Sequence, residues 1–129
     1  MLVVDASVVV PLVADAGSDG DLSRAAVRGH ILVAPDLLRV EVLSVIRRFT
    51  NSGALTKRQA DHAIDDLLAL PITLYPTTPF LRRCWALRAN VTSYDACYVA
   101  LAETLNVTLL TSDARLADAP GTRCRFQLI

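Results

Sequence analysis

The chain has 129 residues, of which 53% are apolar, so it is long enough to bury one sizeable core and too hydrophobic to be disordered. Its 13 basic and 13 acidic residues give a formal net charge of zero, which argues against a uniformly basic nucleic-acid-binding protein. No apolar run reaches the roughly 18 residues of a membrane span, no basic signal-peptide segment opens the chain, and three cysteines without Cys-x-x-Cys spacing predict neither a disulfide framework nor a zinc site. We therefore expect one domain over residues 1–129, cytoplasmic localisation and no membrane partner.

Short apolar segments alternate with helical patterns along the chain. In chain order we expect a strand over 2–5, a helix over 7–14, a helix within 17–30, a strand over 31–35, helices over 36–53 and 56–70, a strand over 72–76, helices over 78–90 and 93–106, a strand over 107–111, a short helix or turn over 112–120 and a strand over 124–129. Asp36, Thr56 and Ser93 are the expected N-caps. The alternation predicts an α/β fold with a parallel sheet and helices on both faces.

Two acidic residues come at the ends of predicted strands. Asp5 ends the first strand, and Asp113 follows the strand over 107–111 by two residues. Ligands of such sheets bind beyond the carboxyl ends of the strands. We therefore expect both carboxylates at one edge of the sheet.

Four acidic residues lie in otherwise apolar segments: Asp5, Glu41, Asp95 and Asp113. Each has a structural alternative. Asp5 and Asp113 could cap helices, Asp95 could interact with a helix dipole, and Glu41 could pair with an arginine. The other nine acidic residues lie in loops or polar surroundings, where a solvated face explains them.

Several carboxylates gathered at one edge repel each other unless a cation is present. Mg²⁺ or Mn²⁺ is the expected cation, because hard cations prefer oxygen ligands. His30 and His62 lack the spacing of a transition-metal site and are expected on the surface. A carboxylate-bound Mg²⁺ site is suited to phosphodiester hydrolysis.

A basic frame around such a site would attract a phosphate backbone. Without the four acids, nine acidic residues face thirteen basic ones, a balance of +4. Twelve of these thirteen are arginines, which suit phosphate contacts, although a compositional bias of the genome is an equal alternative. The candidate frame residues are Arg47, Arg48, Arg82, Arg83, Arg88 and Arg115.

Other enzyme classes fit less well. The chain has no Gly-rich phosphate loop, and no Ser–His–Asp order or Cys–His pairing can be argued. A haloacid-dehalogenase-like phosphatase needs a second acid two residues after its nucleophile, where this chain has Ser7 after Asp5. A response-regulator receiver needs a late lysine, and the only lysine is Lys57.

The acidic segments resemble the motifs of PIN domains, and more narrowly those of VapC toxins from VapBC toxin–antitoxin modules. The matching segments are VVDASV with Asp5, RVEVLSVIRR with Glu41, SYDACYVALAE with Asp95 and LLTSDARL with Asp113. Together they span nearly the whole chain, and their order and spacing are more specific than any one of them.

The resemblance implies a five-stranded parallel sheet between helices and a Mg²⁺- or Mn²⁺-dependent endoribonuclease acting on tRNA or rRNA. The four acids carry over as catalytic and metal-binding residues, and Ser7 and Thr111 match supporting hydroxyl positions. A homodimer is implied, as is a VapB-like antitoxin, encoded directly upstream, whose C-terminal segment wraps the toxin. A solitary PIN nuclease of RNA processing, or a PIN-like binding module without catalysis, are the alternatives.

Several apolar residues could form the dimer or antitoxin contacts, although burial in the core is the stronger alternative for them. They are Leu67, Leu68, Leu70, Phe80 and Trp85.

Overall fold

The computed structural model describes residues 1–129 and contains one parallel sheet of five strands in the order β3-β2-β1-β4-β5. The strands are β1 (Leu2–Val4), β2 (Leu32–Pro35), β3 (Ile72–Tyr75), β4 (Thr108–Thr111) and β5 (Phe126–Leu128). All four pairings are parallel. The strand order changes direction at β1, so β1 and β4 flank the position where ligands bind in such sheets. The predicted α/β class is confirmed.

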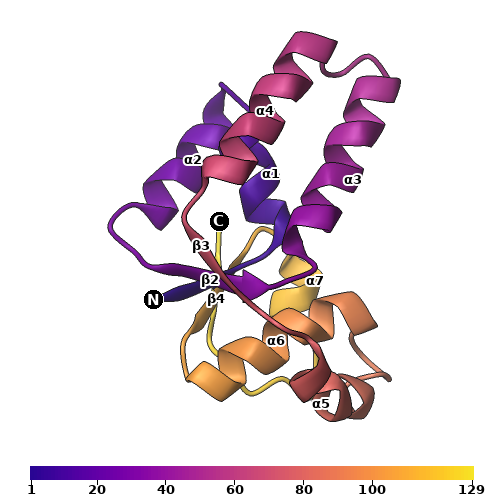
Figure 1. The fold of residues 1–129 in the computed structure, drawn as a ribbon. Helices are drawn as coiled ribbons and strands as arrows, with labels where there is room; N and C mark the ends of the chain where they lie inside the picture. The colour runs from indigo at the N-terminus through magenta and orange to yellow at the C-terminus, as the bar shows by residue number, and fades with distance from the viewer.

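Helices cover both faces of the sheet (Figure 1). They are α1 (Ala6–Ala14), α2 (Ser18–Val27), α3 (Leu38–Asn51), α4 (Lys57–Ala69), the 3₁₀ turn η1 (Thr78–Phe80), α5 (Leu81–Ala86), α6 (Ser93–Leu105) and α7 (Ala114–Ala117). On one face α1 packs against α2, α3 and α4, and α3 and α4 form a hairpin that projects away from the sheet. On the other face α6 packs against β1, β2 and β4 and carries α5. None of these helices has the length and apolarity needed to cross a membrane.

The core lies between β1 and the helices on its two faces. Val3 and Val4 are fully buried, as expected of a central parallel strand. In α6, every residue from 96 to 102 is buried. Cys84 and Cys97 meet in this core as free thiols, with their sulfur atoms 3.7 Å apart. The sheet and α6 thus form the rigid base on which the acidic residues are placed.

The expected helix caps were correct at one of three positions. Thr56 caps α4 through a capping box with Gln59. The cap of α6 is Thr92, and Ser93 is its first residue. Asp36 caps nothing: its backbone N–H donates to the Tyr75 carbonyl across the sheet, and α3 begins at Leu38 without a side-chain cap.

The helix expected over 78–90 is shorter and divided. A 3₁₀ turn containing Pro79 precedes α5, and α5 ends at Ala86. Turns then lead to α6. The proline disfavours the α conformation of the residue before it, which accounts for the separate first turn.

Pro11 lies inside α1, past the first turn of this helix. Because proline has no N–H, the carbonyl of Ser7 four residues earlier has no helical partner. The Ser112 hydroxyl approaches this carbonyl at 3.4 Å. Pro11 therefore leaves a backbone carbonyl beside Asp5 to accept from the Ser112 hydroxyl, at the edge where the site was predicted.

Candidate active site

Asp5 lies at the carboxyl end of β1 and is only 5% exposed. It is the N-cap of α1, since its Oδ1 accepts from the Ser7 N–H at 3.0 Å. The Ser7 hydroxyl also donates to Oδ1, and the Thr111 hydroxyl donates to Oδ2, each at 2.5 Å. The capping alternative is therefore correct, and both hydroxyls expected to support the site contact this carboxylate.

The two hydroxyls have fixed donor directions. Ser7 Oγ accepts from the Ser112 N–H at 2.9 Å, and Thr111 Oγ1 accepts from the Asp113 N–H at 3.1 Å. Each hydroxyl proton is therefore available to Asp5. Burial raises the pKa of Asp5 above its ordinary value, while these two hydroxyl bonds act in the opposite direction. The β4–α7 turn thus fixes a buried carboxylate that has no cationic partner.

Glu41 lies in the first turn of α3 and is half-buried. Its Oε1 accepts a hydrogen bond of 2.7 Å from the hydroxyl of Tyr98 on α6, and no arginine pairs with it. Burial raises the pKa of Glu41, and the charges of Asp95 and Asp5 raise it further. The arginine alternative for Glu41 is wrong, and Tyr98 is a contact that the sequence analysis missed. The only signal was its position three residues after Asp95, on the same helical face.

Asp95 and Asp113 line one small cavity with Thr92, Arg115 and other residues. Asp95 lies in the first turn of α6, whose N-cap is Thr92. Asp113 caps α7, its Oδ1 accepting from the N–H of Arg115 at 2.9 Å. Burial raises the pKa of Asp95, and the charge of Asp113 adds to this, whereas Arg115 lowers it. Both acids therefore serve a helix terminus and also face a shared cavity.

The four predicted acids are close enough for the charge of one to raise the pKa of another, but they do not form a single coordination shell around one metal position. Charge on Asp95 raises the pKa of both Asp5 and Glu41, and charge on Asp113 raises that of Asp95. No three Asp, Glu, His or Cys side chains are arranged to hold a metal ion together. Asp5 and Glu41 line none of the main cavities, whereas Asp95 and Asp113 share one. The protein alone thus offers one or two carboxylates at a time to any one ion.

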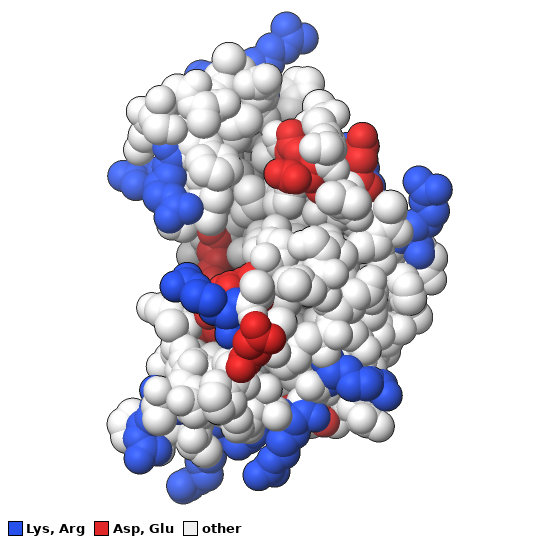
Figure 2. All heavy atoms as spheres, turned by 180° about the vertical axis from the view of Figure 1, so that it is seen from behind, with Lys and Arg blue, Asp and Glu red and all other residues white.

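Figure 2 shows acidic side chains within a hollow at the side of the molecule, with basic side chains around its margins. Arg115 belongs to the cavity of Asp95 and Asp113. Arg88 lies over the ring of Trp85, 4.7 Å from its centroid. Arg47, Arg48 and Arg82 are exposed and form no ion pair. Arg115 is therefore the one predicted frame residue placed beside the acidic residues, and the position of the other four in a basic frame stays a prediction.

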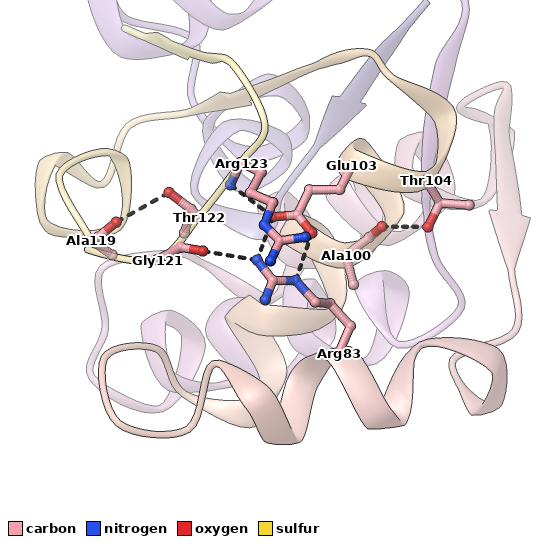
Figure 3. A network of polar contacts seen from close by, with 8 residues as sticks. All are labelled: Arg83, Ala100, Glu103, Thr104, Ala119, Gly121, Thr122 and Arg123. Atoms are coloured by element: carbon pink, nitrogen blue, oxygen red, sulfur yellow. Dashed lines mark hydrogen bonds and ion pairs between the residues drawn. The ribbon is translucent and has the colours of Figure 1, made fainter.

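Arg83 does not belong to that frame. Its side chain forms two hydrogen bonds with Glu103, at 2.8 and 3.0 Å, and a third with the Gly121 carbonyl (Figure 3). Glu103 also accepts from the Arg123 N–H. Glu103 was expected on a solvated face, yet its side chain is only 13% exposed. The pair joins α5, α6 and the segment before β5, and is therefore structural.

The apolar residues considered for partner contacts divide into two groups. Leu67 and Phe80 are buried in the core, and Leu70 is half-buried. Leu68 and Trp85 are 66% and 69% exposed. His30 and His62 lie on the surface, as expected.

Comparisons with known proteins identify the family and the fold. The family model for the PIN domain matches residues 2–121. Ribonuclease VapC1 of Mycobacterium tuberculosis is 44% identical over 128 residues, which cover 98% of this chain and 96% of that protein. The solved structure of Mycobacterium tuberculosis VapC20, a sarcin–ricin loop cleaving toxin, superposes with a TM-score of 0.71 at 12% identity, covering 95% of this chain and 97% of that one. VapBC2 from Rickettsia felis, bound to a DNA fragment from its promoter, gives 0.67 at 12% identity, covering 98% and 97%.

The two solved structures support the fold, whereas the sequence relative and the family model carry the assignment. The predicted resemblance is thereby confirmed. The chain belongs to the PIN-domain family, among the VapC ribonucleases.

Proposed function

We propose that this protein is a divalent-metal-dependent endoribonuclease and the toxin of a VapBC-type toxin–antitoxin pair. The observation that carries the proposal is the set of carboxylates at the edge of the sheet: Asp5, Glu41, Asp95 and Asp113. None of them forms an ion pair with a basic side chain. Burial and neighbouring carboxylates raise the pKa of Asp5, Glu41 and Asp95, and a bound cation stabilises the ionised form of such groups.

The donor chemistry fits Mg²⁺ or Mn²⁺. Mg²⁺ is commonly held by one or two carboxylates, with waters and substrate phosphates completing its shell. A site that offers carboxylates singly or in pairs, and no histidine or thiol, agrees with this preference. Asp5 and Asp95 are the ligands we propose first, with Glu41 and Asp113 extending the site on either side.

When bound, the ion supplies an activated water and stabilises charge on the phosphoryl oxygens during phosphodiester hydrolysis. Ser7 and Thr111 hold the Asp5 carboxylate in one orientation. Arg115 lies beside Asp95 and Asp113, where its guanidinium can bind a substrate phosphate. The proposed substrate is a structured RNA, tRNA or rRNA, because a recessed acidic site with basic margins admits a phosphate backbone held by those margins.

The test is cleavage of tRNA and of rRNA fragments, including the sarcin–ricin loop, by the wild type and by Asp5→Asn. We expect cleavage with Mg²⁺ or Mn²⁺, none with EDTA, and a loss of several orders of magnitude in Asp5→Asn. Asp118→Asn is the matched control, because Asp118 is exposed at the end of α7 and outside the site. Sequencing of RNA ends after expression in cells identifies the cut site. Asp5→Asn cleaving as fast as the wild type would refute the assignment.

A groove beside the site supports an antitoxin partner. It has a volume of about 620 Å³ and lies between α1 and the α3–α4 hairpin, lined by apolar residues such as Val10, Phe49 and Leu55. Ser7 and Ser112 line its end next to Asp5. We propose that the C-terminal segment of a VapB-like antitoxin occupies this groove and extends a basic side chain toward the carboxylates.

Co-expression with the product of the reading frame directly upstream tests this partner. The two proteins should purify together, and Phe49→Glu, at an exposed residue of the groove, should separate them, whereas Leu68→Glu on the exposed side of α4 should not. Absence of such a reading frame would favour the solitary nuclease. We also propose a homodimer in solution, which light scattering of the purified protein measures directly.

A further inference from the structure

Tyr98 is buried, yet its hydroxyl lies among the candidate metal ligands. The side chain is 1% exposed, and its hydroxyl donates to Glu41 Oε1 at 2.7 Å. The hydroxyl is therefore a donor from the core whose partner is the Glu41 carboxylate.

The position of Tyr98 follows from α6. Asp95 and Tyr98 are three residues apart, so they share one face of the helix. That helix packs against β1, β2 and β4, and its residues 96 to 102 are all buried, so Tyr98 is held by the core. Glu41, in contrast, begins a hairpin that projects from the sheet (Figure 1).

The bond from Tyr98 is the only hydrogen bond of the Glu41 side chain. It engages Oε1 and leaves Oε2 without a protein partner. A glutamate side chain has three rotatable bonds, so a single fixed contact decides where its carboxylate points.

We propose that Tyr98 is a positioning residue that holds the Glu41 carboxylate toward Asp5 and Asp95, so that Glu41 can take part in binding a divalent ion. This inference rests on the metal-dependent function proposed above. Residues that orient metal ligands commonly change metal affinity about 10- to 100-fold when they are removed. The competing view is that Tyr98 only fills the core, in which case phenylalanine should replace it without loss.

The test is direct binding of Mn²⁺ without RNA, measured from the electron paramagnetic resonance signal of the free ion. We expect Tyr98→Phe to bind Mn²⁺ about 10-fold more weakly while keeping its circular dichroism spectrum and melting transition. Tyr94→Phe is the matched control, because Tyr94 is on the same helix and 67% exposed. Its affinity should equal that of the wild type. Unchanged affinity in a folded Tyr98→Phe protein would overturn the positioning role and leave the nuclease proposal standing.

A double-mutant cycle tests whether Tyr98 acts through Glu41. In a Glu41→Ala background, Tyr98→Phe should weaken Mn²⁺ binding no further. An equal loss in both backgrounds would show that Tyr98 acts on another ligand, which overturns the inference. Failure of the wild type to bind Mn²⁺ at all would overturn the metal-dependent function and this inference together.

A second measurement keeps Tyr98 intact. The chain has three tyrosines, so Tyr75→Phe combined with Tyr94→Phe leaves Tyr98 as the only source of a tyrosine signal. With tyrosine labelled by ¹³C at Cζ, its resonance should shift when Mg²⁺ is added and return with EDTA. The Glu41→Ala substitution should move it in the absence of metal. A resonance that responds to neither change contradicts the inference.

Discussion

Asp5 and Thr111 are 106 residues apart in the chain and are joined by a hydrogen bond from the threonine hydroxyl to Asp5 Oδ2. The bond connects the ends of β1 and β4, which are neighbouring parallel strands. The same hydroxyl accepts from the N–H of Asp113. One buried hydroxyl therefore connects the Asp5 carboxylate to the backbone of Asp113 through the strand order of the sheet.

Removal of this hydroxyl should reduce both stability and activity. In Thr111→Val, the Asp5 carboxylate loses a donor and the Asp113 N–H loses its acceptor, at a cost of about 1–3 kcal/mol in the free energy of unfolding. Urea denaturation in EDTA measures this cost. Thr111→Ser is the control, because it keeps the hydroxyl and loses only a methyl group, worth roughly 0.8 kcal/mol. Equal stability of the two variants would contradict the role given to the hydroxyl.

The carboxylates also predict how stability depends on pH when no metal is present. Burial raises the pKa of Asp5, Glu41 and Asp95 in the folded protein, so the folded state binds protons more tightly than the unfolded state. Stability contributed by these groups is therefore greatest at low pH. It falls as the pH rises from their ordinary pKa values, 3.8 for aspartate and 4.5 for glutamate, through the raised ones.

Thermal unfolding in EDTA between pH 4 and 7 tests this sign. We compare the wild type with the triple variant Asp5→Asn, Glu41→Gln, Asp95→Asn, which cannot titrate at these positions. The wild type should lose stability relative to the variant as the pH rises, and Mg²⁺ should restore it near neutrality, because metal and protons compete for the same oxygens. If the stability of the wild type in EDTA instead rises relative to that of the variant as the pH increases, the ionised carboxylates are stabilised without a cation.

Much of the site could be read from local sequence. Asp5 and Asp113 could be placed at one edge because each follows a buried segment, and the carboxyl ends of parallel strands lie together. The capping role of Asp113 was left open and is present, together with its position in a cavity. An acidic residue at the end of a strand can therefore cap the following helix and also belong to the candidate site.

Contacts between distant segments could not be read in this way. Tyr98 and Glu41 are 57 residues apart, and Arg83 and Glu103 are 20 apart, with no local pattern that links either pair. The expected cap at Asp36 was wrong for a related reason. Its N–H is used by the Tyr75 carbonyl, an interaction set by the pairing of β2 with β3.

The Arg83–Glu103 pair should matter for stability and not for RNA. Glu103→Ala removes two bonds to Arg83 and the acceptor of the Arg123 N–H, which should lower the free energy of unfolding by about 1–2 kcal/mol. RNA affinity should be unchanged. Asp61→Ala is the control, because its pair with Lys57 is exposed and should contribute nothing measurable. If the Glu103→Ala protein folds and binds RNA more weakly, the Arg83–Glu103 pair contributes to RNA binding, and Arg83 belongs to the basic frame after all.

Arg115 should contribute to RNA binding because it is exposed beside Asp95 and Asp113. Arg115→Ala should weaken RNA binding and reduce the dependence of log K on log salt by about 0.7–0.9, the contribution of one phosphate contact. Fluorescence anisotropy with a catalytically inactive Asp5→Asn background measures both quantities without cleavage.

Arg28→Ala provides the control for nonspecific charge. Arg28 is also exposed, but it follows α2 and precedes β2, so it lies at the edge of the sheet opposite the carboxyl ends of the strands. Its removal changes the net charge by the same amount and should leave both affinity and salt dependence unchanged. If the two arginines have equal effects, RNA responds to the total charge of the protein, and the basic margin of the acidic hollow has no special role in holding the substrate.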